Sequence, residues 1–257
     1  MKRVVVTGAG GGIGAALARR FASQGAEVIV NDVDPVAAEA VASEIGGLPV
    51  PGDAASEDDT RRLIDTAWAE LGGIDLFCAT AGTLTAGDES TPDDVWLRDF
   101  SVNVMSHVYV TRALLPRWLD GDGGRLLVTV SAAGLLTLLG SAPYSVTKHA
   151  ALGFAEWLRA TYAHRGITVQ ALCPQGVNTA MMTAGERSAS KAILAAGALE
   201  PDDVAETVVK ALAGDSFLIL PHPEVADFYQ RRATDPDRWL GGMNKIQRGF
   251  DDAAATS

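Results

Sequence analysis

Tyr144 and Lys148 are the residues of this sequence best suited to proton transfer. They lie four residues apart in a segment that begins with Pro143 and stays apolar-periodic through Leu152, so a helix would place both on one face. Bringing the pKa of a phenol from near 10 to near 7 needs roughly 4 kcal/mol. An ammonium group about 4 Å away contributes on the order of 4 kcal/mol at an effective dielectric near 20. The pair therefore predicts a tyrosine base assisted by a lysine, although the spacing alone also fits an exposed helical pair.

Ser131 lies thirteen residues before Tyr144 and directly follows an apolar run, 125–130, that reads as a strand. Open parallel sheets bind ligands at the carboxyl ends of their strands. A hydroxyl at this place could hold a substrate oxygen beside the tyrosine. We therefore expect Ser131 to belong to the same site.

The segment that follows the strand at 3–7 is rich in glycine and leads into a helical pattern from Ala15 to Phe21. Glycines here let the backbone approach a pyrophosphate, and the amino end of the helix attracts the anion. The chain fits T-G-x-x-x-G-x-G through Thr7, Gly8, Gly12 and Gly14, with Ile13 between the last two. No Gly-Lys-Ser/Thr follows, so a P-loop is excluded. The alternative is a loop that only eases packing.

Asp32 lies at the end of the second predicted strand, 18 residues after Gly14. A carboxylate at this point can accept hydrogen bonds from the adenosine ribose. It would repel a 2′-phosphate, and Gly11, Asn31 and Val33 offer no positive charge to neutralise it. The sequence predicts NAD in preference to NADP. The alternative is that Asp32 only caps the next helix, a role that Asp34 fits better.

These residues must be positioned by alternating strands and helices. Short β-branched runs alternate with longer periodic segments, the pattern of βαβ units and of a parallel sheet covered on both faces. The strand candidates are 3–7, 27–31, 48–51, 74–77, 125–130, 168–172 and 217–220. We predict an α/β chain with a single-domain, Rossmann-type, doubly wound parallel sheet of about seven strands, flanked by helices.

The chain should form one domain over residues 1–250 that binds a dinucleotide and carries the catalytic site. We expect a substrate loop at about 179–199 and a C-terminal segment at about 221–250. Residues 251–257 form a soft tail that we expect to be disordered.

Composition narrows the classes of partner. The formal charge of −11 opposes binding to nucleic acid and to anionic membranes. Cys78 and Cys173 each end an apolar run and read as buried, reduced thiols, and the four histidines show no metal-ligand spacing. Glycines break the N-terminal apolar run, and polar residues with Pro143 interrupt the uncharged stretch 126–147. We expect a cytoplasmic protein without a metal site.

The glycine loop, Ser131, Tyr144 and Lys148 together resemble the short-chain dehydrogenase/reductase family, specifically its compact classical branch. The resemblance covers about residues 1–220. It implies that Asn103 is a fourth catalytic residue, which bends a helix and holds a water on the proton path. The resemblance, together with the motifs above, gives a cofactor site of Thr7, Gly8, Gly12, Ile13, Gly14, Asp32, Asp53, Ala54, Ala81, Gly82, Tyr144, Lys148, Pro174, Val177 and Thr179.

Two positions depart from the family pattern. Ala79-Thr80-Ala81-Gly82 stands where the family has Asn-Asn-Ala-Gly, so an amide that ties the sheet to neighbouring backbone is absent. Gln175 stands where a glycine usually follows the proline. Its side chain would either narrow the pocket or hydrogen-bond the substrate.

The resemblance implies an NAD-dependent enzyme that interconverts a secondary alcohol and a ketone. We expect an uncharged or hydrophobic substrate in a pocket lined by Ala133, Leu135, Gln175, Met181 and Met182. The alternative is that the leucines of this region are ordinary core or subunit contacts. It also implies a homo-oligomer, a dimer or tetramer, formed through helices at about 92–120 and 143–164. Two alternatives stay open: a catalytically silent dinucleotide-binding regulator or scaffold, and an epimerase or dehydratase of the extended branch. The latter would need a larger C-terminal domain than the roughly 37 residues left here after the last strand.

Overall fold

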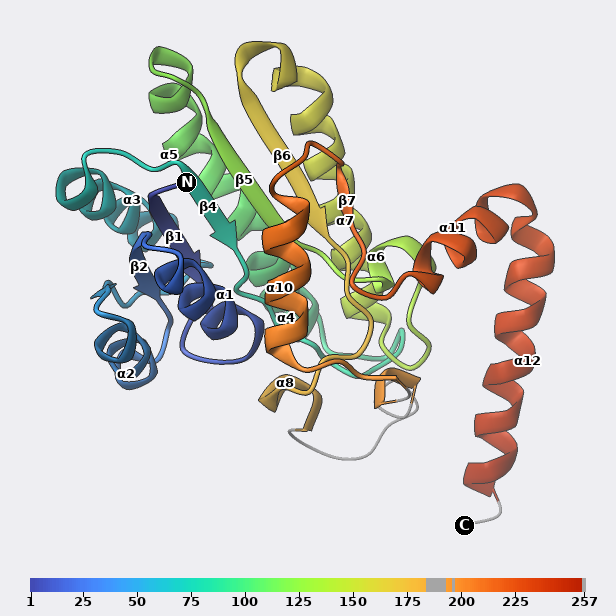
Figure 1. Cartoon of the computed structure of the whole chain (residues 1–257). Helices are drawn as coiled ribbons and strands as arrows, with labels where there is room; N and C mark the ends of the chain where they lie inside the picture. Colours follow the sequence, from blue (N-terminus) through green and yellow to red (C-terminus); the bar gives the residue numbers. More distant parts are fainter. Residues whose placement is uncertain (184–192, 196, 256–257) are drawn as a thin grey trace.

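A sheet of seven parallel strands forms the centre of the protein, in the order β3-β2-β1-β4-β5-β6-β7 (Figure 1). The computed structural model describes residues 1–183, 193–195 and 197–255. The strands are β1 (Arg3–Thr7), β2 (Glu27–Asn31), β3 (Leu48–Pro49), β4 (Leu76–Ala79), β5 (Gly124–Thr129), β6 (Ile167–Leu172) and β7 (Leu218–Ile219). The strand order reverses between β1 and β4, as in a doubly wound Rossmann-type sheet. The predicted fold class is confirmed.

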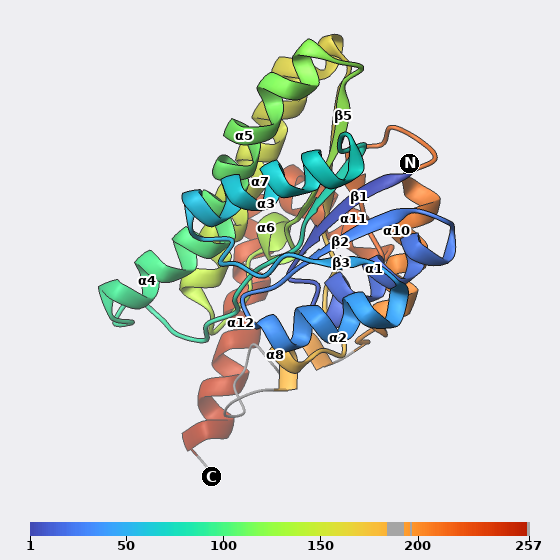
Figure 2. The same ribbon diagram turned by 90° about the vertical axis from the view of Figure 1, so that its left-hand side faces the viewer.

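Helices cover both faces of the sheet (Figure 2). One layer holds α1 (Gly12–Ser23), α2 (Pro35–Ile45) and α10 (Pro201–Ala211), and the other holds α3 (Glu57–Leu71), α5 (Ser106–Asp120) and α7 (Ala142–Tyr162). Alternation along β1 explains the two layers, because Val4 and Val6 pack on the first and Val5 on the second. Each strand is therefore buried on both sides, which accounts for its nearly continuous apolar sequence.

Capping side chains set the first turns of the helices that frame the site. Asp34 accepts hydrogen bonds from the backbone of Val36 and Ala37 at the start of α2, and Ser56 accepts one from Asp59 at the start of α3.

A five-residue π-helical turn, Ser101–Met105, joins α4 (Asp93–Phe100) to α5. This turn inserts an extra residue into what would otherwise be one long helix.

The C-terminal segment forms two helices, α11 (Glu224–Thr234) and α12 (Pro236–Ala255). α12 extends away from the body of the protein (Figure 1). The expectation of a disordered tail from residue 251 is wrong for the described residues, because α12 runs on to Ala255. Within this helix Gln247 donates a hydrogen bond to Asp251, one turn later. Residues 256–257 lie outside the described residues. None of the helices described combines the length and apolar character needed to cross a bilayer.

Candidate active site

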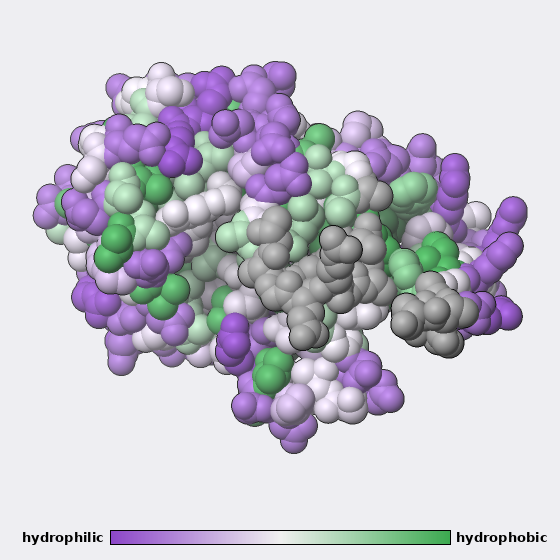
Figure 3. Space-filling view, turned by 90° about the horizontal axis from the view of Figure 1, so that it is seen from below, coloured by the Kyte–Doolittle hydropathy of each residue, from purple (hydrophilic) through white to green (hydrophobic). Residues whose placement is uncertain are grey.

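The predicted site residues gather at the carboxyl ends of β1, β4, β5 and β6, around a cavity of about 300 Å³. Figure 3 looks onto this face from below and shows pale and green residues among the purple ones. Of the predicted residues, the cavity is lined by Gly8, Gly12, Ile13, Gly14, Asp32, Ala81, Gly82, Ser131, Tyr144, Lys148, Pro174, Gln175, Val177, Thr179, Met181 and Met182. The topology thus brings together side chains that lie up to 174 positions apart, from Gly8 to Met182.

The glycine loop is closed against its neighbours and open toward the cavity. Gly8 has φ of +63°, and a Cβ there would lie 2.8 Å from the Cα of Ala81. A Cβ at Gly14 would lie 2.1 Å from the carbonyl oxygen of Gly8. At Gly11 a Cβ would meet nothing within 4 Å, and this residue precedes α1 without a side-chain cap. Bare backbone at the amino end of a helix fits the pyrophosphate of a dinucleotide.

A second cavity, of about 380 Å³, continues the first toward β2 and shares Gly8, Asp32 and Gly82 with it. Asp53 and Ala54 line it, as predicted for the adenine side. The two cavities share a border at these residues, so a ligand that fills both would contact the glycine loop and Asp32 together.

The Asp32 carboxylate accepts hydrogen bonds from the backbone of Gly10 at 2.9 Å and of Asp34 at 3.0 Å. Asp34 rather than Asp32 caps α2, so the alternative role of Asp32 does not match the structure. Arg98 of α4 also lines this cavity. The residues next to Asp32 in the sequence do not indicate that Arg98 lines the same cavity, because the position of Arg98 depends on the path of α4.

Tyr144, Lys148 and Ser131 are all buried, at 8%, 3% and 5% exposure. The Lys148 ammonium nitrogen lies 5.6 Å from the centre of the Tyr144 ring and donates to the carbonyl of Thr129 at 3.0 Å. Ser131 Oγ accepts from the backbone of Ala133 at 3.1 Å. The two helical residues do share one face, and β5 ends beside them, as the spacing predicts.

The pKa of Tyr144 runs against the sequence prediction. Burial raises it to about 12, while a hydrogen bond with Ser131 acts in the lowering direction. Burial also lowers the pKa of Lys148 to about 8. The dominant influence on both groups is removal from water, which disfavours each charged form. In the protein without cofactor, burial therefore outweighs any lowering of the phenol pKa by the lysine.

Asn103 lies in the π-helical turn and is fully buried. Its Oδ1 accepts from the backbone N–H of Thr83 at 2.9 Å, and its Nδ2 donates to the carbonyl of Thr83 and to Thr147 Oγ1. A methyl group at Gly82 would lie 3.2 Å from Asn103 Oδ1 and 3.5 Å from Lys148 Nζ. Asn103 and Lys148 therefore both border the same glycine.

The family model for short chain dehydrogenases matches residues 2–190 of this chain. The chain belongs to the short chain dehydrogenase family. A crystal structure of a short chain dehydrogenase/reductase from Burkholderia phymatum in complex with NAD superposes with a TM-score of 0.85 at 26% identity, over 92% of this chain and 94% of that one.

Characterised dehydrogenases are also similar in sequence. The 1-deoxy-11-beta-hydroxypentalenate dehydrogenase of Streptomyces exfoliatus is 35% identical over 87% of this chain and 84% of its own. Mouse epidermal retinol dehydrogenase 2 is 30% identical over 85% of this chain and 73% of its own. The relatives thus span nearly the whole of this short chain dehydrogenase.

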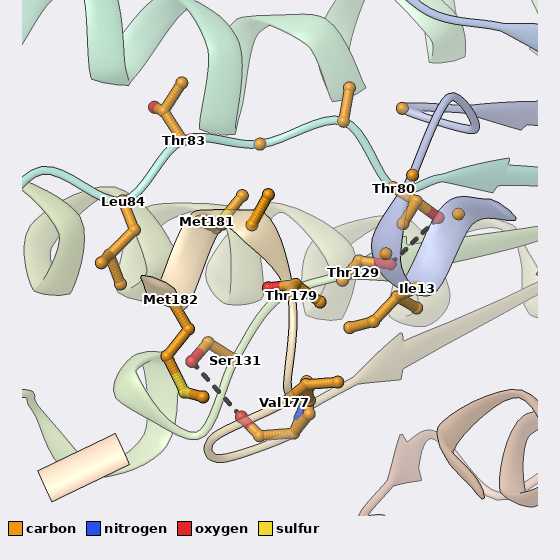
Figure 4. Close-up of a pocket in the computed structure, with 18 of the residues that line it drawn as sticks. Ile13, Thr80, Thr83, Leu84, Thr129, Ser131, Val177, Thr179, Met181 and Met182 are labelled. Carbon is orange, nitrogen blue, oxygen red and sulfur yellow. Dashed lines mark hydrogen bonds between the residues drawn. The ribbon is translucent and has the colours of Figure 1, made fainter. Parts of the chain in front are cut away.

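Two threonines tie the loop after β4, where the family pattern described above leads to the expectation of an asparagine. Thr7 Oγ1 accepts from the backbone N–H groups of Thr80 and Ala81 at 3.0 and 3.2 Å. Thr129 Oγ1 donates to Thr80 Oγ1 at 3.2 Å (Figure 4). These contacts join β1, β4 and β5 without the missing amide, so the departure keeps the sheet tied.

The substrate end of the dehydrogenase cavity differs in part from the prediction. Gln175, Met181 and Met182 line it, and Gln175 Nε2 donates to Glu224 of α11 at 3.5 Å. Leu135 was wrongly placed there: it is fully buried in the main core, because the short helix α6 (Ala133–Leu136) turns it inward.

Ala133 packs beside Tyr144 in a small buried cluster but does not line the cavity. The cavity wall also includes residues that the sequence did not point to: Thr80, Thr83, Leu84, Thr129, Gly176 and Leu194. Of the predicted substrate loop at 179–199, residues 184–192 and 196 lie outside the described residues.

Proposed function

We propose that this protein is an NAD-dependent dehydrogenase that interconverts a secondary alcohol and a ketone. The observation that carries the proposal is the convergence of Ser131, Tyr144 and Lys148 on one cavity beside an open glycine loop. A buried phenol next to a hydroxyl and an ammonium group has the parts needed to move a proton on and off an alcohol oxygen.

In the direction of oxidation, the Tyr144 phenolate would take the hydroxyl proton of the alcohol while Ser131 orients the alcohol oxygen. Lys148 would place positive charge beside the phenolate, because its ammonium group points into the same cavity. Asn103 would hold the π-helical turn against Thr83 and so support a path for protons to solvent. In the reverse direction Tyr144 would return the proton to the carbonyl oxygen.

NAD would supply the hydride acceptor when bound. The glycine loop would bind its phosphates, Asp32 its adenosine ribose, and Asp53 with Ala54 the adenine. Pro174, Val177 and Thr179 line the first cavity but not the second, and would hold the nicotinamide.

The described cavity walls favour an uncharged or hydrophobic substrate. Apolar surface in the cavity that Ser131 lines comes from Leu84, Met181, Met182 and Leu194. Figure 4 labels the first three of these together with Ser131. Methionine side chains adapt to ligands of irregular shape. Relatives named as a hydroxypentalenate dehydrogenase and a retinol dehydrogenase support a search among ring-bearing and long-chain alcohols.

The chemical role of Tyr144 is tested by Tyr144→Phe, which removes one oxygen from a buried side chain. The rate of NAD reduction with a panel of small, aryl, cyclic and steroid alcohols should fall by about 10²-fold or more. The dissociation constant for NAD, measured by fluorescence titration, should change by less than about threefold. Turnover retained in Tyr144→Phe would refute the role, and a wild type that binds NAD but oxidises nothing would favour a silent regulator.

The preference for NAD is tested by Asp32→Ala. Loss of the carboxylate removes both the acceptor for the ribose and the repulsion of a 2′-phosphate. The ratio of kcat/KM for NAD to that for NADP should fall by about tenfold. Asp34→Asn removes a charge two residues away while keeping a helix cap, and its ratio should match the wild type. An unchanged ratio in Asp32→Ala would sink the assignment.

A further inference from the structure

Asp99 of α4 is a fully buried acid that the proposed mechanism does not use. Its Oδ1 accepts hydrogen bonds from Thr83 Oγ1 at 2.9 Å and from Thr85 Oγ1 at 3.0 Å. Its Oδ2 is buried without a hydrogen-bond partner among the described residues. Keeping a carboxylate away from water is costly, so each such group calls for a reason.

The two threonines flank Leu84, which lines the substrate cavity. Leu84 also packs against the small cluster that contains Tyr144. The same segment is held from its other side by Asn103, whose Oδ1 accepts from the Thr83 backbone, and by Ser141, which donates to the Thr85 carbonyl. Asp99 is therefore one of three clamps on the wall of the cavity.

α4 packs against α7, the helix that carries Tyr144 and Lys148. The negative charge of Asp99 raises the pKa of both of these groups, although burial is the larger influence on each. Cys173, from the end of β6, also acts on the pair, but burial raises the pKa of its thiol to about 12 and keeps it neutral. Among the described residues, Asp99 is thus the carboxyl group that acts on the pair.

A histidine also faces the pair, from α5. Burial lowers the pKa of His107 to about 3, and the positive charge of Lys148 acts in the same direction, so the imidazole is neutral at physiological pH. His149, on α7 itself, contacts the Ser145 carbonyl and Arg232 of α11. Neither group supplies negative charge to the site.

We propose that Asp99 is a positioning residue of this active site: its carboxylate holds the segment Thr83–Thr85 as a wall of the substrate cavity and places one negative charge beside the Tyr144–Lys148 pair. The effect on the wall rests on the proposed function. The effect on charge does not, because it acts on Lys148 whether or not the protein turns over a substrate.

The charge effect is tested by NMR on the protein without cofactor, labelled with ¹³C-lysine. The sequence has only five lysines, and the Lys148 signal is assigned by its loss in Lys148→Met. In the wild type this signal should titrate near pH 8. Asp99→Asn keeps an oxygen acceptor for the threonines but removes the charge, and should lower the midpoint by about half a pH unit or more.

Asp94→Asn is the matched control, because it removes the same charge from an exposed position of the same helix. Its Lys148 midpoint should equal that of the wild type, and Asp99→Glu should restore the wild-type midpoint. Asp99→Ser serves as a second neutral variant if Asp99→Asn does not fold. An unchanged midpoint in the neutral variant, or an equal shift in Asp94→Asn, would overturn the charge effect.

The wall effect is tested by Thr85→Val, which removes one hydroxyl from Asp99 and keeps the charge. The KM for the best alcohol should rise by about threefold or more while kcat and the Lys148 midpoint stay unchanged. An unchanged KM would overturn this part. If no alcohol is oxidised by any variant while Asp99→Asn still shifts the Lys148 signal, the proposed dehydrogenase activity fails and the charge effect of Asp99 stands.

Discussion

Lys148 shows most directly how burial opposes the charge that the proposed chemistry needs. Only 3% of it is exposed, and its ammonium donates to the carbonyl of Thr129. Burial lowers its pKa to about 8, whereas the same group in an unfolded chain titrates near 10.4. The unfolded chain therefore binds a proton more tightly than the folded protein between these pH values. Holding Lys148 charged at neutral pH costs the fold about 3 kcal/mol.

This cost predicts the pH dependence of stability. Because the unfolded state holds more protons between about pH 8 and 10.4, stability from this group should rise with pH through that window. We therefore compare the free energy of unfolding of Lys148→Met with that of the wild type at two pH values. The difference, variant minus wild type, should be about 3 kcal/mol more positive at pH 7 than at pH 10.5. Urea denaturation at both pH values measures this difference. The exposed Lys210→Met should show a difference near zero, and a constant offset for Lys148→Met would contradict the argument.

Element by element, the sequence predicts the sheet well, because doubly buried strands carry continuous apolar runs. The start of β4 is the informative error. Ile74 is buried like a strand residue, but pairing with β1 begins only at Leu76, and the Ile74 carbonyl instead accepts from the Trp118 indole. An apolar run in the sequence indicates that its residues are buried. It does not indicate which of them pair with a neighbouring strand.

The position of the candidate site could be predicted because its residues stand at strand ends and at a helical spacing of four. Arg98 and Leu84 were not readable, since each reaches its cavity through the course of a loop or helix set by distant contacts. Leu135 was misplaced because an apolar run does not say which side of a short helix meets the core. The pKa of Tyr144 was misjudged because the sequence shows its charged neighbour and not its burial.

The outer face of α7 carries apolar residues that have no cover among the described residues. Val146 and Trp157 are 53% and 54% exposed, and their separation of eleven residues puts them on one side of the helix. Ala150 and Gly153 lie between them, small enough to let another helix approach. We expect this face to pair with a second copy of the chain.

Light scattering should therefore give at least a dimer for the wild type, and Trp157→Glu should shift the population toward monomer. Val36 is 76% exposed on α2, so Val36→Glu makes an equal change away from α7 and should leave the oligomer intact. A wild type that is monomeric at all concentrations would contradict this prediction.

At the scale of the whole molecule, the sheet separates two cores, and the groove at its carboxyl edge touches elements that belong to both. Ile13 and Val177 pack on one core, whereas Tyr144 belongs to a small separate cluster and lies on α7, a helix of the other layer. A ligand that fills the groove would therefore contact both layers. Ligand binding stabilises the native state as a whole, by about 2.7 kcal/mol at 100 times the dissociation constant.

The place of β1 in the sheet has a consequence for synthesis on the ribosome. β1 is translated first, but one of its edges stays unpaired until β4 has been made. The paired residues Val4 of β1 and Leu76 of β4 lie 72 positions apart in the sequence. At about 5–20 residues per second, the chain needs several seconds to grow from β2 to β4. During that time a strand destined for the centre of the sheet is an open edge, able to pair with any other strand it meets. The nascent chain thus carries an open edge on β1 until β4 is available to cover it.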